Sequence, residues 1–224
     1  MNLVVVTGRP GTGKTTLCRE LAALARTRGL VVRGLLTVAP PLDEGPDAGP
    51  GAQWGLESPN AGGSGVERRL EDLASGERRL LGSEVPLEQR RPGDPRWRLV
   101  DDTLAWGDAV LRAACPTDVL IVDEAGPVEL LHQRGWLAGM RQALGGPYAV
   151  AAVVVRPWLV PRFLDVISAG PRAAAPVIVD VEDPAAAGVM DGCLEQIVAD
   201  RSVAIGRAES DGSVAGQAST VVRA

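Results

Sequence analysis

Short apolar runs alternate along the chain with stretches in which apolar residues recur at helical spacing. The β-branched run Asn2–Thr7 predicts a strand buried on both faces of a parallel sheet. From Lys14 to about Arg28, leucine and alanine recur with the period of an amphipathic helix, and Gly29 ends it. The alternation continues to about residue 201, which indicates an α/β fold of three layers, a mainly parallel sheet flanked by helices. The further strands expected are 30–37, 118–123, 149–155 and 176–181, and the further helices are 103–114 (with Asp102 or Thr103 as N-cap), 135–144, 158–167 and 184–201.

Three stretches depart from this alternation. Residues 38–65 are rich in glycine and proline and are expected to form a mobile insert. Residues 206–224 are small and polar and are expected to form a disordered C-terminal tail, so a single domain is placed at 1–205. Residues 66–84 repeat Glu-Arg-Arg-Leu on both sides of a turn-like Ala-Ser-Gly. Their periodicity fits either a β-hairpin or a helix ending at Gly76.

Composition narrows the classes of partner. The chain has 224 residues, of which 46% are hydrophobic and 23% charged, values typical of one globular domain. A net charge of -5 gives no indication of nucleic acid or an anionic membrane as a partner. No apolar run reaches the ~18 residues of a spanning helix, and no basic segment precedes the first strand, so we expect a cytoplasmic protein. The three cysteines (Cys18, Cys115 and Cys193) are scattered and are expected to be buried thiols rather than a zinc site or disulfides.

A glycine-rich loop follows the first predicted strand directly. Residues 8–15 read Gly-Arg-Pro-Gly-Thr-Gly-Lys-Thr and match G-x-x-x-x-G-K-[ST] at every fixed position, between a strand and a helix, which is the context that confirms a P-loop. The glycines let successive N–H groups turn toward phosphate oxygens, and the following helix offers its N-terminus to the same anion. We therefore predict a P-loop NTPase fold and a nucleoside triphosphate (ATP or GTP) as the partner. The binding residues expected are Gly8, Arg9, Pro10, Gly11, Thr12, Gly13, Lys14, Thr15 and Thr16.

Lys14 is the only lysine in the chain, because the other 22 of the 23 basic residues are arginines. A compact ammonium has been kept at a place where a planar guanidinium would not fit. We predict that Lys14 contacts the β- and γ-phosphates during catalysis and that the Thr15 hydroxyl is a ligand of Mg²⁺.

An acidic pair ends the predicted strand 118–123. A carboxylate at the C-terminal end of a parallel strand points into the crevice where ligands bind, so Asp123 is predicted to hold Mg²⁺. Glu124 is a candidate general base for water, although both acids could instead cap the next helix. Arg156 follows the next predicted strand on the same edge of the sheet and is a candidate catalytic cation, with Arg162 as an alternative; either could also be a solvated surface residue.

Together, these motifs resemble those of the small P-loop nucleoside-triphosphatases, the family that includes the cancer-related nucleoside-triphosphatase of animals and its thermophile relatives. The first motif is Gly-Arg-Pro-Gly-Thr-Gly-Lys-Thr-Thr-Leu, and the second is Val-Asp-Glu-Ala-Gly-Pro-Val-Glu-Leu at 122–130. The family's second signature falls on Asp123, Glu124, Gly126, Pro127, Glu129 and Leu130.

The resemblance has two implications, and the sequence departs from the family at one place. It implies Mg²⁺-dependent, slow and base-tolerant hydrolysis of a nucleoside triphosphate to diphosphate and phosphate. It favours the hairpin for the repeat, because residues 65–81 resemble the family's hairpin after the second strand. After Thr37, however, the insert replaces the arginine-bearing turn that the family usually carries, so no contact from that turn is carried over.

Two other functions fit the same motifs. In a small-molecule kinase, the arginine pairs at 68–69, 78–79 and 90–91 would form a lid over the phosphates, although the sequence shows no acceptor site. In a nucleotide-dependent switch, the insert would dock a protein partner only in the triphosphate state.

Overall fold

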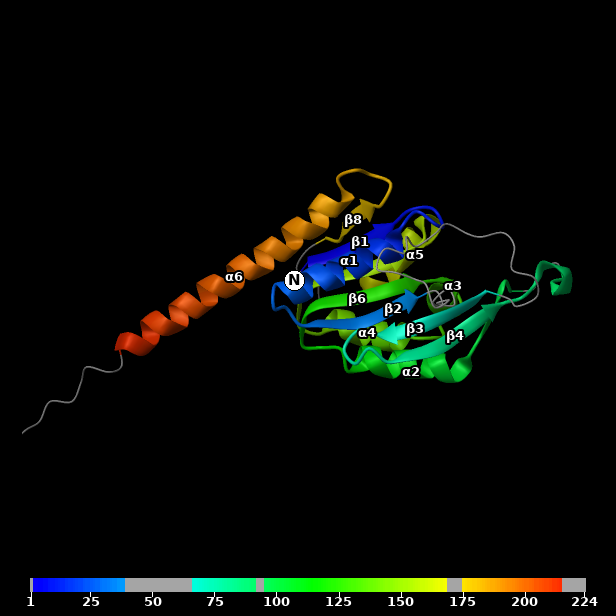
Figure 1. Ribbon diagram of the computed structural model, residues 1–224, viewed down its shortest axis with the longest axis horizontal. Coiled ribbons are helices and arrows are strands. Elements are labelled where there is room, and N and C mark those ends of the chain that lie inside the picture. The colour runs from blue at the N-terminus through cyan, green and yellow to red at the C-terminus, as the bar shows by residue number, and fades with distance from the viewer. Residues whose placement is uncertain (1, 39–65, 92–94, 169–174, 215–224) are drawn as a thin grey trace, which may run out of the picture.

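The computed structural model describes residues 2–38, 66–91, 95–168 and 175–214, and for residues 201–214 it describes the backbone alone. The predicted insert therefore lies almost wholly outside the described residues. Eight described strands form one sheet in the order β5-β4-β3-β2-β6-β7-β1-β8 (Figure 1). The strands are β1 Asn2–Thr7, β2 Val32–Val38, β3 Glu67–Asp72, β4 Arg78–Glu84, β5 Trp97–Leu99, β6 Thr117–Ala125, β7 Tyr148–Val155 and β8 Val177–Asp180. The helices are α1 Lys14–Thr27, α2 Asp101–Arg112, α3 Pro127–Leu130, α4 Leu137–Gly145, α5 Val160–Ser168 and α6 Ala186–Val214, with 3₁₀ turns η1 Leu87–Gln89 and η2 Pro157–Leu159.

The sheet is mainly parallel, as predicted. Strands β2, β6, β7, β1 and β8 pair in parallel, while β3 and β5 run antiparallel to their neighbours at one end. Each parallel strand is followed on its carboxyl side by a loop, and these loops meet at one edge of the sheet. The first of them is the predicted P-loop, between β1 and α1.

Two apolar layers lie on the two faces of the sheet. Alternate residues of β1 point to opposite faces, so that Leu3 and Val5 pack with α2, α4 and α5, whereas Val4 and Val6 pack with α1 and α6. The central strands are buried on both sides, which explains why they are continuous runs of valine, isoleucine and leucine. The loops at the carboxyl edge of the sheet are thus attached to strands that are buried in a three-layer core.

The repeat at 66–84 is a hairpin, as the family resemblance favoured, and the helix alternative is wrong. Its two strands pair antiparallel, with Leu70 opposite Arg79. The Asp72 carboxylate accepts hydrogen bonds from Ala74 N (2.9 Å) and Ser75 Oγ (2.6 Å), which closes the turn. The adjoining strand β5 was not predicted, because three residues are too few to show a period.

Two boundaries also differ from the prediction. Helix α2 begins at Asp101 and its N-cap is Val100, without a side-chain cap; the Thr103 hydroxyl donates instead to the carbonyl of Leu80 (2.8 Å). Helix α6 continues to Val214, so residues 206–214 are helical rather than an irregular tail, since no proline interrupts them. Residues 215–224 lie outside the described part.

All three cysteines are free thiols. Cys18 is fully buried in α1, and burial raises the pKa of its thiol well above the usual range. In the described part of the chain, no helix combines the length and apolar character needed to cross a membrane.

Candidate nucleotide-binding site

Three glycines give the P-loop its shape. Gly8, Gly11 and Gly13 have φ values of 138°, 79° and 94°, in the region that side chains rarely adopt. At Gly8 space is also restricted, because a Cβ there would lie 2.7 Å from Val181 Cγ2. The loop therefore needs glycine at these positions, as the motif predicts.

The Lys14 ammonium lies inside the curve of this loop. Its Nζ donates to the carbonyls of Gly8 (2.8 Å) and Arg9 (2.5 Å). Burial lowers the pKa of Lys14, and the nearby Glu124 and Asp123 partly offset that effect. The Lys14 ammonium thus bonds two carbonyls of the loop and also lies within electrostatic range of Asp123 and Glu124.

Asp123 connects the P-loop helix to the central strands. Its side chain is 1% exposed, and it accepts hydrogen bonds from Thr15 Oγ1 (3.0 Å) and from the backbone N–H of Thr37 (3.0 Å). Burial raises the pKa of Asp123 to about 6, although both hydrogen bonds oppose the change.

A divalent cation fits these groups. A buried carboxylate beside a hydroxyl supplies the hard oxygen ligands that Mg²⁺ prefers, and a cation would favour the ionised form that burial disfavours. Among the described residues, no cluster of three or more His, Cys, Asp or Glu side chains could hold a metal. A Mg²⁺ ion at Thr15 and Asp123 would thus take further ligands from phosphate and water, as such sites commonly do.

Glu124 has an unusual backbone. Its φ is 74°, and the register of β6 against β7 shifts between Val122 and Ala125, so Glu124 leaves the ladder at the carboxyl edge. Its carboxylate accepts a hydrogen bond from Arg156 Nη2 at 2.5 Å. A non-glycine residue in this conformation is strained and is typical of functional sites. The structure therefore brings Glu124 and Arg156 together.

Arg162 lies elsewhere. Its Nε donates to the carbonyl of Leu130 at the end of α3 (3.2 Å), so it braces this short helix rather than the acidic pair.

Sequence reasoning missed one partner of the P-loop. Glu182, just after β8, accepts hydrogen bonds from Arg9 Nε (3.0 and 3.1 Å) and from the Arg9 backbone N–H (3.3 Å). The only signal was its place at the carboxyl end of a parallel strand. Thr37 was missed as well, because it contributes a backbone N–H that any residue would carry.

Three of the six arginines of the proposed kinase lid, Arg68, Arg78 and Arg79, are engaged within the hairpin region. Arg78 pairs with Glu71 (2.6 Å), Arg79 pairs with Glu77 (2.8 Å), and the Arg68 guanidinium lies over the Trp97 ring. These contacts hold the three side chains along the hairpin in this structure.

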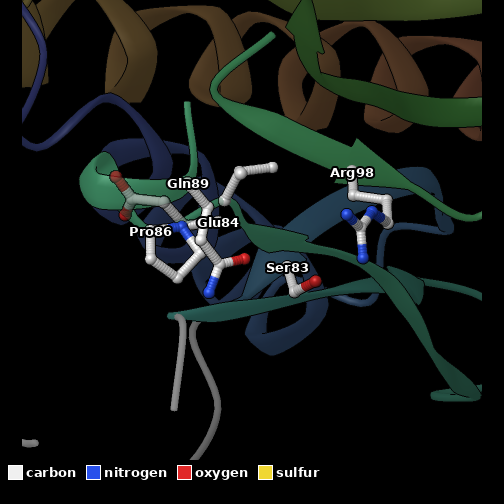
Figure 2. Close-up of a pocket in the computed structure, with 6 residues that line it drawn as sticks. Ser83, Glu84, Pro86, Gln89 and Arg98 are labelled. Carbon is white, nitrogen blue, oxygen red and sulfur yellow. The ribbon is translucent and has the colours of Figure 1, made fainter. Parts of the chain in front are cut away.

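A surface hollow of about 160 Å³ lies near this hairpin. Figure 2 shows it at the end of β4, between η1 and β5. It shares the carboxyl edge with the P-loop, but β3, β2, β6 and β7 separate β4 from β1. It therefore gives no acceptor site beside the phosphates. The lining residues are Ser83, Glu84, Val85, Pro86, Gln89 and Arg98.

A glycine loop between a buried strand and a helix, with an acidic pair at a nearby strand end, defines a P-loop nucleotide-binding protein. A family model described as NTPase matches residues 3–45. The chain is 36% identical over 129 residues to nucleoside-triphosphatase THEP1 of Methanopyrus kandleri, covering 57% of this chain and 59% of that protein. It is 30% identical over 152 residues to THEP1 of Methanosarcina acetivorans, covering 67% of this chain and 74% of that protein.

The chain belongs to the THEP1 nucleoside-triphosphatase family, which confirms the resemblance noted from its motifs. It spans about three fifths of the length of the Methanopyrus kandleri relative and of THEP1 from Methanothermobacter thermautotrophicus (59% and 62%). The fold is also that of a human cancer-related nucleoside triphosphatase solved in solution. That likeness has a TM-score of 0.57 at 20% identity and covers 88% of this chain and 97% of the other.

Proposed function

We propose that this protein hydrolyses nucleoside triphosphates to diphosphate and phosphate in the presence of Mg²⁺, accepting ATP and GTP alike. The observation that carries the proposal is that two consecutive acids at one strand end have different partners. Asp123 is bonded to the P-loop helix through Thr15, and Glu124 is turned out of the sheet toward Arg156. The names of the relatives support the same activity.

The P-loop residues bind the triphosphate. Backbone N–H groups of the loop, other than that of Arg9, which donates to Glu182, and excluding Pro10, which has none, bind the phosphates together with the N-terminus of α1. Lys14 exchanges its two loop carbonyls for phosphate oxygens. Thr15 and Asp123 would hold Mg²⁺, which would neutralise charge on the phosphates when bound.

Glu124 orients the attacking water and accepts its proton. The water oxygen forms a bond to the γ-phosphorus while the bond from that phosphorus to the β–γ bridging oxygen breaks, and the diphosphate keeps the electron pair. The proton passes to the Glu124 carboxylate and then to solvent. Arg156, already paired with Glu124, places a cation where charge develops on the transferring phosphoryl group.

Steady-state phosphate release from ATP, GTP, CTP and UTP tests this proposal, with and without Mg²⁺. Glu124→Gln should lower kcat by about 10²-fold or more while nucleotide affinity survives, because the amide cannot accept the proton. Glu195→Gln, at an exposed position of α6, is the matched control and should behave as wild type. A wild-type protein with no Mg²⁺-dependent phosphate release would refute the activity, and normal turnover by Glu124→Gln would refute the assignment of the base.

A further inference from the structure

A third carboxylate lies buried close to Glu124. Glu129, in the short helix α3, is 3% exposed. Its Oε2 accepts a hydrogen bond from the backbone N–H of Gly126 at 3.0 Å. Its Oε1 is buried and makes no hydrogen bond among the described residues, although the backbone N–H groups of Glu129 and Trp136 lie close enough to the carboxylate to lower its pKa. A carboxylate kept this way is costly, so it needs a reason beyond filling space.

The two carboxylates pack against the same glycine. A Cβ on Gly126 would lie 3.6 Å from Glu124 Cγ and 3.6 Å from Glu129 Oε2. The Gly126 N–H that Glu129 holds is two residues along the chain from Glu124. Any movement of that peptide therefore reaches Glu124 through one intervening residue.

A glycine on the far side keeps room for the Glu129 carboxylate. Gly135 has a φ of 61°, and a Cβ there would overlap Glu129 Oε1. The chain thus leaves space for this side chain at Gly135 and gives it a hydrogen-bond donor at Gly126. The space at Gly135 and the donor at Gly126 together fix the position of the Glu129 carboxylate.

We propose that Glu129 is a positioning residue that holds the strained backbone of Glu124 in the conformation required for hydrolysis. The inference rests on the function proposed above. A φ of 74° is unfavourable for a non-glycine residue, so the Glu124 peptide relaxes unless its surroundings hold it. Arg156 holds the side chain, and Glu129 holds the backbone on the C-terminal side through Gly126. A displacement of about 1 Å at a catalytic group can lower the rate by about 10²-fold.

Three variants test the inference by separating kcat from binding. Glu129→Leu keeps the approximate size but removes the acceptor, and it should lower kcat by about 10- to 100-fold while KM and the Kd for ATP stay within about threefold. Glu129→Gln keeps an acceptor for Gly126 and should retain kcat within about threefold. Gly135→Ala should displace the carboxylate and lower kcat in the manner of Glu129→Leu. Gly145→Ala controls for an added methyl group that meets no atom within 4 Å, and Gly76→Ala, with a φ of 75° and the same open space, controls for the backbone strain.

The outcomes are separable. Wild-type kcat in Glu129→Leu, or a proportional loss of affinity and kcat, would overturn the positioning role. So would a Glu129→Gln protein as slow as Glu129→Leu, because the role requires only an acceptor. If Glu129→Leu does not fold, Gly135→Ala decides: a lower kcat with unchanged Kd supports the role, and a normal kcat overturns it.

Glu124→Gln is assayed in parallel to distinguish the two proposals. If it is inactive while Glu129→Leu and Gly135→Ala turn over normally, the positioning role fails and the proposed function stands. If Glu124→Gln turns over normally, the proposed chemistry fails, whatever the Glu129 variants do.

Discussion

The charge on Glu129 should make the protein less stable as the pH rises. Burial raises the pKa of Glu129 from 4.5 to about 7, while the backbone N–H of Gly126 opposes the change and the nearby Glu124 adds to it. The amide of Glu129→Gln keeps the size and the acceptor without the charge. We therefore expect Glu129→Gln to be more stable than wild type at pH 8.

The size of the effect follows from the pKa. The folded-state pKa lies about 2.5 above the ordinary 4.5, and each pKa unit is worth about 1.4 kcal/mol. Because the folded protein holds this proton more tightly than the unfolded chain, the stability it contributes is fully present below about pH 4.5 and is lost as the pH rises through about 7. The loss is about 1 kcal/mol at pH 5 and about 3 kcal/mol at pH 8. The gap between variant and wild type should widen by about 2 kcal/mol over that interval.

Urea unfolding followed by tryptophan fluorescence measures this gap at pH 5, 6, 7 and 8, without nucleotide or metal. The titration of Asp123 is common to both proteins and cancels in the difference. Glu195→Gln controls for the loss of one exposed charge. Parallel stability profiles for wild type and Glu129→Gln, or a variant that is less stable at pH 8, would refute the reasoning.

Three further substitutions probe the loop, the metal ligand and the sheet. Lys14→Arg should lower kcat by about 10²-fold or more and weaken ATP binding measured by calorimetry, because a planar fork cannot replace an ammonium held between two carbonyls; near-normal turnover would show that the lone lysine has no special role. Asp123→Asn should abolish the extra thermal stabilisation that Mg²⁺ gives to the ATP complex over EDTA, since the neutral amide is a poor ligand; an unchanged Mg²⁺ effect would place the metal elsewhere. Gly34→Ala should destabilise the fold by about 3 kcal/mol or more in urea, because φ is 120° and a Cβ would overlap a carbonyl oxygen of β6; Gly145→Ala should stay near wild type, and equal midpoints for the two would contradict the argument.

The sequence by itself determined the features that depend on contiguous residues. The P-loop is such a feature, because the three glycines, Lys14 and the Thr15 hydroxyl all fall within residues 8–16, where a strand leads into a helix. The layered fold is another, since buried parallel strands must be continuous apolar runs. The place of Asp123 followed as well, because every parallel strand delivers its last residues to the same edge of the sheet.

Only the tertiary structure decided what meets those residues. Arg9 and Glu182 are 173 positions apart, and nothing local in either marks the other as its partner. The burial of Glu129, its use of one backbone N–H and the bulge that turns Glu124 outward depend on how β6, β7 and α3 pack. Periodicity could not distinguish a hairpin from a helix at 66–84, because the apolar positions of so short a segment fit both structures. Only the pairing of the two strands across the turn decides between them. Motifs of contiguous residues thus identify the site, whereas contacts between distant segments set the pKa values and the orientation of its carboxylates.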